Sequence, residues 1–107
     1  MKQFSDYNEL SQNIQSNGHV LLYFSAPWCA PCNVMGPVMD DIGKDFGNIL
    51  TTIKVDVEKV PELAGEYGVQ AVPTVLLLNK GDVVDKAVGA QPKAHLSRWL
   101  SDHLLVY

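Results

Sequence analysis

The sequence contains the stretch HVLLYFSAPWCAPC at residues 19–32. Residues 19–25 form a nearly continuous apolar run, which is typical of a strand buried on both faces of a sheet. The stretch then reaches Cys29 and Cys32, the two cysteines of the chain, where the apolar spacing changes to that of a helix. It therefore predicts a central strand that leads into a cysteine pair at the start of a helix.

Helix and strand patterns alternate along the rest of the chain. A helix of about ten residues is expected between an N-cap at Ser5 and a stop at Gly18. Further helices are expected at about 30–46, with a kink at Pro37, at 61–67 and from Pro92 to Leu104, and further strands at 51–57, 74–78 and 83–88. The order helix, strand, helix, strand, helix, strand, strand, helix predicts an α/β fold with a mixed sheet.

Length and charge narrow the class of protein. The 107 residues fit a single domain, 1–107, that buries roughly 65% of its unfolded-chain surface. The formal net charge of −4 and the scattered basic residues argue against nucleic-acid or anionic-membrane binding.

No charged residue lies between Leu10 and Met39, yet the longest apolar run there, Val20–Phe24, is far shorter than the ~20 residues needed to span a bilayer. The first residues lack a secretory pattern, so a cytoplasmic location is expected.

The cysteine pair allows three interpretations. A structural zinc needs four Cys or His ligands, and the histidines are not at ligand spacing, so we expect no metal. A structural disulfide would close a very short loop and contribute only about 2 kcal/mol. In a reducing compartment a redox-active dithiol is favoured over both.

The redox interpretation gives the two cysteines different roles. Free backbone amides and the macrodipole at a helix N-terminus stabilise negative charge on the first cysteine, so Cys29 is the expected nucleophile. Cys29 would form a mixed disulfide with a substrate. Cys32, one turn further along, would attack that bond and release the reduced substrate.

Motifs spread over the whole chain resemble those of the thioredoxin family. They are Trp28-Cys29-Ala30-Pro31-Cys32, Pro37 in the second helix, Val72-Pro73-Thr74, Lys80-Gly81 in the hairpin, and Val88-Gly89-Ala90 before the last helix. The resemblance implies a thioredoxin fold, in which helices flank both faces of a single central mixed sheet, and a protein-disulfide reductase activity. It also implies disulfide-containing protein substrates and reduction by a thioredoxin reductase that uses NADPH. No cofactor is expected to bind to this chain, which we expect to be a monomer.

The resemblance also implies a substrate-binding surface around the cysteines. Pro73 is expected to be a cis proline facing them, which turns the backbone of Val72 outward to pair with an extended substrate segment. Trp28 alone is equally compatible with core packing, and Trp99 is expected to belong to the core. The substrate would meet an apolar collar made of Trp28, Val72, Gly89 and Ala90.

Three positions depart from the family pattern. Tyr23 stands where the pattern has a buried aspartate that takes the proton of the second cysteine, and a phenol with a pKa of about 10 is a poor base at neutral pH. We expect Tyr23 to be only a core residue. The alternative is that its hydroxyl hydrogen-bonds the site. Lys54 matches the family's lysine beside that aspartate and therefore loses its usual partner. Ala30 replaces a glycine, which we expect to move the redox potential. Asn33 replaces a common lysine, which we expect to change the choice of partner.

Pro31 favours a reductant, because disulfide oxidants and isomerases of the superfamily often have a histidine just before the second cysteine. The preferred function is therefore a general protein-disulfide reductase. A dithiol oxidase or isomerase is one alternative. The missing aspartate keeps a third open, a redox sensor or binding module with the same fold and weak reductase activity.

Overall fold

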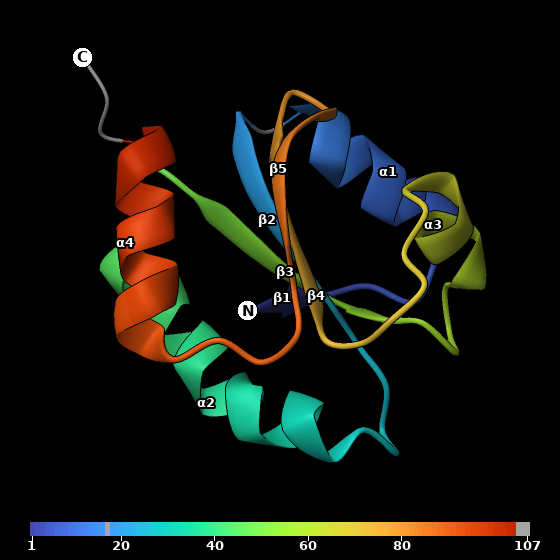
Figure 1. The fold of residues 1–107 in the computed structure, drawn as a ribbon. Helices are drawn as coiled ribbons and strands as arrows, with labels where there is room; N and C mark the ends of the chain where they lie inside the picture. Colours follow the sequence, from blue (N-terminus) through green and yellow to red (C-terminus); the bar gives the residue numbers. More distant parts are fainter. Residues whose placement is uncertain (17, 105–107) are drawn as a thin grey trace.

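The computed structural model of the chain describes residues 1–16 and 18–104 (Figure 1). Along these residues the chain forms β1 (Lys2–Gln3), α1 (Tyr7–Ser16), β2 (His19–Ser25), α2 (Ala30–Asp45), β3 (Thr51–Asp56), α3 (Pro61–Glu66), β4 (Thr74–Asn79), β5 (Asp82–Val88) and α4 (Lys93–Leu104). Apart from β1, this order confirms the α/β pattern predicted from the sequence.

The strands pair in a mixed sheet with the order β1-β3-β2-β4-β5. β2 lies in the middle, parallel to β3 and antiparallel to β4. Every residue from Val20 to Ser25 is buried, as a strand covered on both faces requires. The prediction of a buried central strand is confirmed.

Helices cover both faces of this sheet. In Figure 1, α1 and α3 lie on one side of the strands, and α2 and α4 lie on the other. Successive side chains of β2 alternate between the two layers. Leu22 and Phe24 belong to the core shared with α1 and α3, whereas Leu21 and Tyr23 belong to the core shared with α2 and α4. The alternation therefore directs Tyr23 toward the helix that carries the cysteines.

The N-terminal segment differs from the sequence-based expectation in two ways. Both residues of β1 are exposed and carry no hydrophobic pattern, so the sequence does not predict this strand, which pairs in parallel with β3. The side chain that caps α1 is Asp6 and not Ser5, because Asp6 Oδ2 accepts a hydrogen bond of 3.2 Å from the Glu9 amide. A carboxylate at this position also interacts favourably with the helix dipole.

α2 carries the cysteine site along one face of the sheet. It begins at Ala30 as expected and ends at Asp45, one residue short of the expected end at Phe46. Pro37 lies inside the helix and removes one backbone donor. Figure 1 shows the axis of α2 changing direction along its length, in agreement with the expected kink.

Candidate active site

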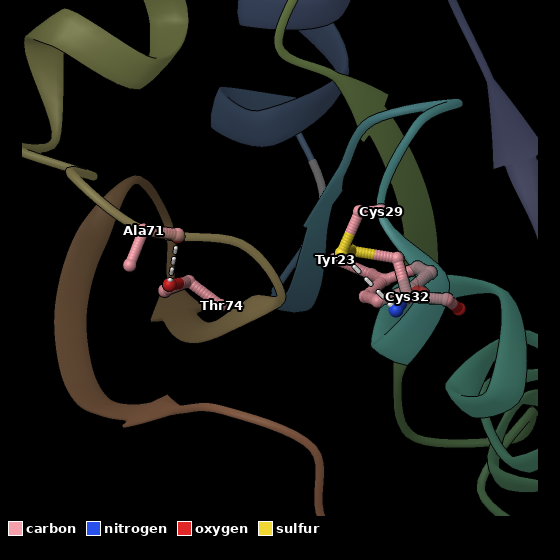
Figure 2. Close-up of a disulfide and its surroundings, with 5 residues drawn as sticks. All are labelled: Tyr23, Cys29, Cys32, Ala71 and Thr74. Carbon is pink, nitrogen blue, oxygen red and sulfur yellow. Dashed lines mark hydrogen bonds between the residues drawn. A yellow bond between two sulfur atoms is a disulfide. The ribbon is translucent and has the colours of Figure 1, made fainter.

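The two cysteines lie where the central strand gives way to α2. Cys29 is the N-cap of α2, and Cys32 lies in its first turn. They form a disulfide with a Cα–Cα distance of 5.2 Å (Figure 2). Only 5% of Cys29 and 3% of Cys32 is exposed. Pro31 loses no hydrogen bond here, since the first amides of a helix have no partner within it.

The backbone at the start of α2 is arranged around the sulfur of Cys29. The Cys32 amide donates a hydrogen bond of 3.2 Å to Cys29 Sγ, so the cysteine side chain itself caps the helix. Once the disulfide is reduced, this donor and the helix dipole favour a thiolate at Cys29. Ala30 and Pro31 form the exposed turn between the cysteines.

The loop between α3 and β4 lies beside the cysteine pair. The Val72–Pro73 peptide bond is cis, which confirms the expectation drawn from the family resemblance. Val72 packs against the apolar cluster that contains both cysteines, and Pro73 is buried. Thr74 Oγ1 donates a hydrogen bond of 2.7 Å to the Ala71 carbonyl, which closes the turn around the Val72–Pro73 bond (Figure 2). Thr74 was part of the quoted motif, but the sequence does not reveal this bond.

Gly89 reaches the same loop from the end of β5. Its amide donates a hydrogen bond of 2.8 Å to the carbonyl of Pro73. Its φ of +93° lies in a region that side-chain-bearing residues avoid, which explains a glycine at this position. Ala90 follows it and is exposed. The motif at 88–90 is thus brought next to the cis-proline loop.

Trp28 lies on the surface just before the first cysteine. Its side chain is 69% exposed, so the alternative of core packing is wrong. Together with Val69 and Val72 it lines an apolar groove of about 400 Å³. Trp99 is half-buried against the core of α2 and α4, and its Nε1 donates a 2.9 Å hydrogen bond to Asp85, so the expectation of a core residue is confirmed only in part.

Tyr23 approaches the site from the central strand. Its hydroxyl donates a hydrogen bond of 2.5 Å to the Cys32 carbonyl (Figure 2). The expectation of a core residue without contact to the site is therefore wrong, and the alternative of a hydroxyl bonded to the site is confirmed. Burial raises the pKa of Tyr23, so the phenol is protonated at neutral pH. The apolar pattern of β2 could not show this contact, because it indicates which residues are buried but not which group the Tyr23 hydroxyl contacts.

A cavity of about 240 Å³ adjoins Cys32, and Tyr23, Lys54 and Asp56 line it. Lys54 is the register partner of Tyr23 in the neighbouring strand. Asp56 is only 8% exposed and was not among the predicted site residues. The alternation of β3 does place it on the same strand face as Lys54, which is the one sequence signal that could have drawn attention to it.

Comparison with known proteins gives the same family as the motifs. The thioredoxin family model matches residues 2–102. The thioredoxin of Bacillus subtilis (strain 168) is 43% identical over 89 residues, which cover 83% of this chain and 86% of that protein. The chain belongs to the thioredoxin family. Among solved structures, a thioredoxin from Nicotiana alata has a TM-score of 0.89 at 33% identity, covering 96% of this chain and 91% of that one.

A second structural neighbour comes from work on the thiol-resolving mechanism of yeast mitochondrial 1-Cys peroxiredoxin via glutathione and thioredoxin systems. It has a TM-score of 0.85 at 26% identity and covers 95% of this chain and 94% of that chain. Thioredoxins are disulfide oxidoreductases, and this thioredoxin-family chain has its cysteine pair at disulfide distance. The fold and the redox chemistry expected from the sequence are therefore confirmed.

The residues that the structure describes contain no group of three or more His, Cys, Asp and Glu side chains that could hold a metal ion. None of the helices formed by these residues is long and apolar enough to cross a membrane.

Proposed function

We propose that this chain is a general protein-disulfide reductase, a single domain of residues 1–107 in which Cys29 attacks the substrate and Cys32 resolves the mixed disulfide. The observation that carries this proposal is the hydrogen bond of 3.2 Å from the Cys32 amide to Cys29 Sγ. A sulfur at the N-cap gains from the free amides and the helix dipole. The sulfur of Cys32, a turn into the helix, lies further from both.

The proposed reaction consists of two thiol–disulfide exchanges. The Cys29 thiolate attacks one sulfur of the substrate disulfide, forms a mixed disulfide and releases the other substrate sulfur as a thiolate. Cys32, once deprotonated, attacks Cys29 Sγ, forms the intramolecular disulfide and releases the second substrate thiolate. Two electrons pass from the dithiol to the substrate, and each released thiolate takes up a proton.

The proposed substrate surface surrounds the exposed rim of this pair. An extended substrate segment would pair with the backbone of Val72, which packs beside the cysteines and precedes the buried Pro73. Trp28 would offer an apolar face, being 69% exposed. Gly89 and Ala90 would border the substrate segment from the other side, since the Gly89 amide donates a hydrogen bond to the Pro73 carbonyl.

The proposed electron source is a thioredoxin reductase that oxidises NADPH, so the chain acts as a monomeric electron carrier in the cytoplasm without a bound cofactor. The link between the yeast neighbour and a 1-Cys peroxiredoxin supports peroxiredoxins as one class of substrate. Pro31 supports the reducing direction, because it brings no positive charge to the thiolate. Ala30 and Lys54 would adjust the potential of the pair.

Steady-state turnover tests this proposal. Oxidised chain, catalytic thioredoxin reductase, NADPH and insulin are mixed, and NADPH oxidation is followed by its absorbance. Insulin-dependent turnover is expected for the wild type and loss of it for Cys29→Ser and Cys32→Ser. A repeat with dithiothreitol in place of the reductase separates the two parts of the claim. No acceleration of insulin reduction with either electron source would contradict the proposed function.

The reduction potential separates a reductant from an oxidase or isomerase. Thioredoxin has a potential of about −270 mV, and a reductant of this kind should lie near it. Equilibration of the Cys29–Cys32 pair in glutathione or dithiothreitol buffers measures the value. A potential above about −200 mV would place the chain among the oxidants and isomerases.

A further inference from the structure

The cavity beside Cys32 bears on how Cys32 is deprotonated, a question that rests on the proposed reductase function. Cys32 must lose a proton before it can attack the mixed disulfide, because the thiolate is the nucleophile. Cys32 is only 3% exposed, so bulk water reaches its thiol poorly. The cavity of about 240 Å³ that it lines has room for several water molecules.

Tyr23 cannot take this proton. Its hydroxyl is already committed as a donor to the Cys32 carbonyl, at 2.5 Å. Burial also raises its pKa, which keeps the phenol neutral. The residue that stands in place of the family's buried aspartate therefore positions the backbone of Cys32 without acting as a base.

Asp56 provides a carboxylate in the same cavity. Only 8% of the residue is exposed, and its Oδ1 accepts a hydrogen bond of 2.9 Å from the Glu58 amide. The Asp56 side chain makes no other hydrogen bond or ion pair within the part of the chain that the structure describes, which leaves Oδ2 available to a water molecule. The side chain is thus held in place and can still accept a proton.

The sheet register places Asp56 at the correct end of the cavity. β3 runs parallel to β2, with Tyr23 opposite Lys54 and Ser25 opposite Asp56. Asp56 is therefore one alternation step closer than Lys54 to the end of β2, where the chain turns toward the cysteines. The titratable side chains that line the cavity with Cys32 are Tyr23 from β2 and Lys54 and Asp56 from β3. Asp56 is the one among them that carries a carboxyl group.

We propose that Asp56 is the proton acceptor for Cys32, acting through water in this cavity from a strand neighbouring that of the missing aspartate. During resolution the Cys32 thiol gives its proton to the water, and the water gives one to the Asp56 carboxylate. The Cys32 thiolate then forms the bond to Cys29 Sγ as the bond to the substrate sulfur breaks. The departing substrate thiolate is protonated from solvent, and Asp56 returns its proton to solvent before the next cycle.

Lys54 supports the same step as a positive charge. It lines the cavity and lies two residues before Asp56 on the same strand face. An ammonium near the sulfur favours the thiolate over the thiol. Lys54 thus assists deprotonation of Cys32, whereas Asp56 receives the proton.

Stopped-flow measurement with a small aromatic disulfide isolates the resolving step. Reduced protein is mixed with 5,5′-dithiobis(2-nitrobenzoate), whose first thionitrobenzoate is released by Cys29 and whose second is released when Cys32 resolves the mixed disulfide. Both phases are recorded from pH 5.5 to 9.5 for the wild type and Asp56→Asn. Asp56→Asn keeps the shape of the side chain and an acceptor for the Glu58 amide.

We expect Asp56→Asn to slow the second phase about tenfold at pH 6.5, less than the hundredfold or more of direct general-base catalysis because water intervenes, and to change the first phase less than twofold. The difference should shrink as the pH rises toward 9.5, where hydroxide removes the proton directly. Asp56→Glu, which retains a carboxylate, should recover most of the rate. Asp102→Asn, on an exposed residue of α4 with 69% of its side chain exposed, is the matched control and should behave as wild type.

A second phase that Asp56→Asn leaves unchanged at every pH would overturn the role of Asp56. So would equal slowing at pH 6.5 and 9.5, or a failure of Asp56→Glu to recover the rate in a protein that melts normally, because these results indicate a structural effect. The proposed function fails in a different way. A wild type that releases only the first thionitrobenzoate lacks a resolving cysteine whatever the role of Asp56.

Discussion

Tyr23 shows how one side chain changes the site of a thioredoxin-family protein. The hydroxyl lies 2.5 Å from the Cys32 carbonyl, at the position where the family pattern has a carboxylate. The exchange replaces a base with a neutral donor, since burial raises the pKa of the phenol. At this scale the residue contributes stability and geometry to the first turn of α2, and proton transfer is left to other groups.

Tyr23→Phe should therefore destabilise the protein. It removes the hydroxyl's hydrogen bond to the Cys32 carbonyl, and the loss of unfolding free energy should be about 0.5–1.5 kcal/mol because the helical Gly36 amide still serves that carbonyl. Urea unfolding of the oxidised protein measures the loss. Tyr67→Phe is the matched control, because the Tyr67 hydroxyl forms no hydrogen bond among the described residues, and it should cost less than about 0.5 kcal/mol. Equal losses in both variants would contradict the structural role of the Tyr23 hydroxyl.

At the scale of elements, two connections position the parts that the sheet does not hold directly. The hydrogen bond of 2.7 Å from Thr74 Oγ1 to the Ala71 carbonyl fixes the shape of the cis-proline loop, and Val72 packs this loop against the cysteine cluster. α4 is fastened to β5 through Asp85, whose Oδ2 accepts hydrogen bonds from Trp99 at 2.9 Å and from His103 at 2.8 Å. The first connection bears on substrate binding and the second on stability.

Thr74→Val should weaken the reduction of protein substrates. Without the hydroxyl the Ala71 carbonyl loses its partner, and the loop is held less firmly in its binding conformation. A loss of about 1 kcal/mol corresponds to about a fivefold lower kcat/KM for insulin. Thr74→Ser keeps the hydroxyl and should retain wild-type activity. The reaction of Cys29 with a small aromatic disulfide needs no loop and should be unchanged in both, so a slower small-molecule reaction in Thr74→Val would argue against a loop effect.

The Asp85 connection makes stability depend on acid pH. The pKa of Asp85 is lowered from its ordinary value of 3.8. The largest cause is the hydrogen bond from the Lys86 amide, and the hydrogen bond from His103 lowers the pKa further. A carboxylate with a lower pKa in the folded state stabilises the fold above its unfolded pKa, and this stabilisation is lost as the pH falls through the folded pKa.

Asp85→Asn should therefore reduce the unfolding free energy by about 1 kcal/mol at pH 7, the range of a partly exposed pair. The difference from wild type should disappear at a pH well below 3.8. Urea unfolding at a series of pH values provides the comparison, with Asp102→Asn as the exposed control. A difference that persists unchanged into acid would show that Asp85 acts through packing and not through its charge.

Across the whole molecule, the sequence predicts the structural features that depend on repeated hydrophobic patterns and on motifs. The apolar run of β2 and the switch to helical spacing after Cys29 are enough to place the cysteine pair, and the motif at 72–74 implies the cis bond. β1 escapes prediction because two exposed residues have no pattern. The exposure of Trp28 and the cavity position of Asp56 escape it because they depend on how separate elements pack.

Trapping of mixed disulfides distinguishes the attacking cysteine, proposed to be Cys29, from the resolving cysteine, proposed to be Cys32. Reduced Cys32→Ser and Cys29→Ser are incubated with a mixture of disulfide-containing proteins, and covalent adducts are separated on non-reducing gels. Cys32→Ser should accumulate adducts that dithiothreitol releases, because its mixed disulfides on Cys29 cannot be resolved. Cys29→Ser should accumulate few. Equal trapping by the two variants, or more by Cys29→Ser, would overturn the roles of the two cysteines.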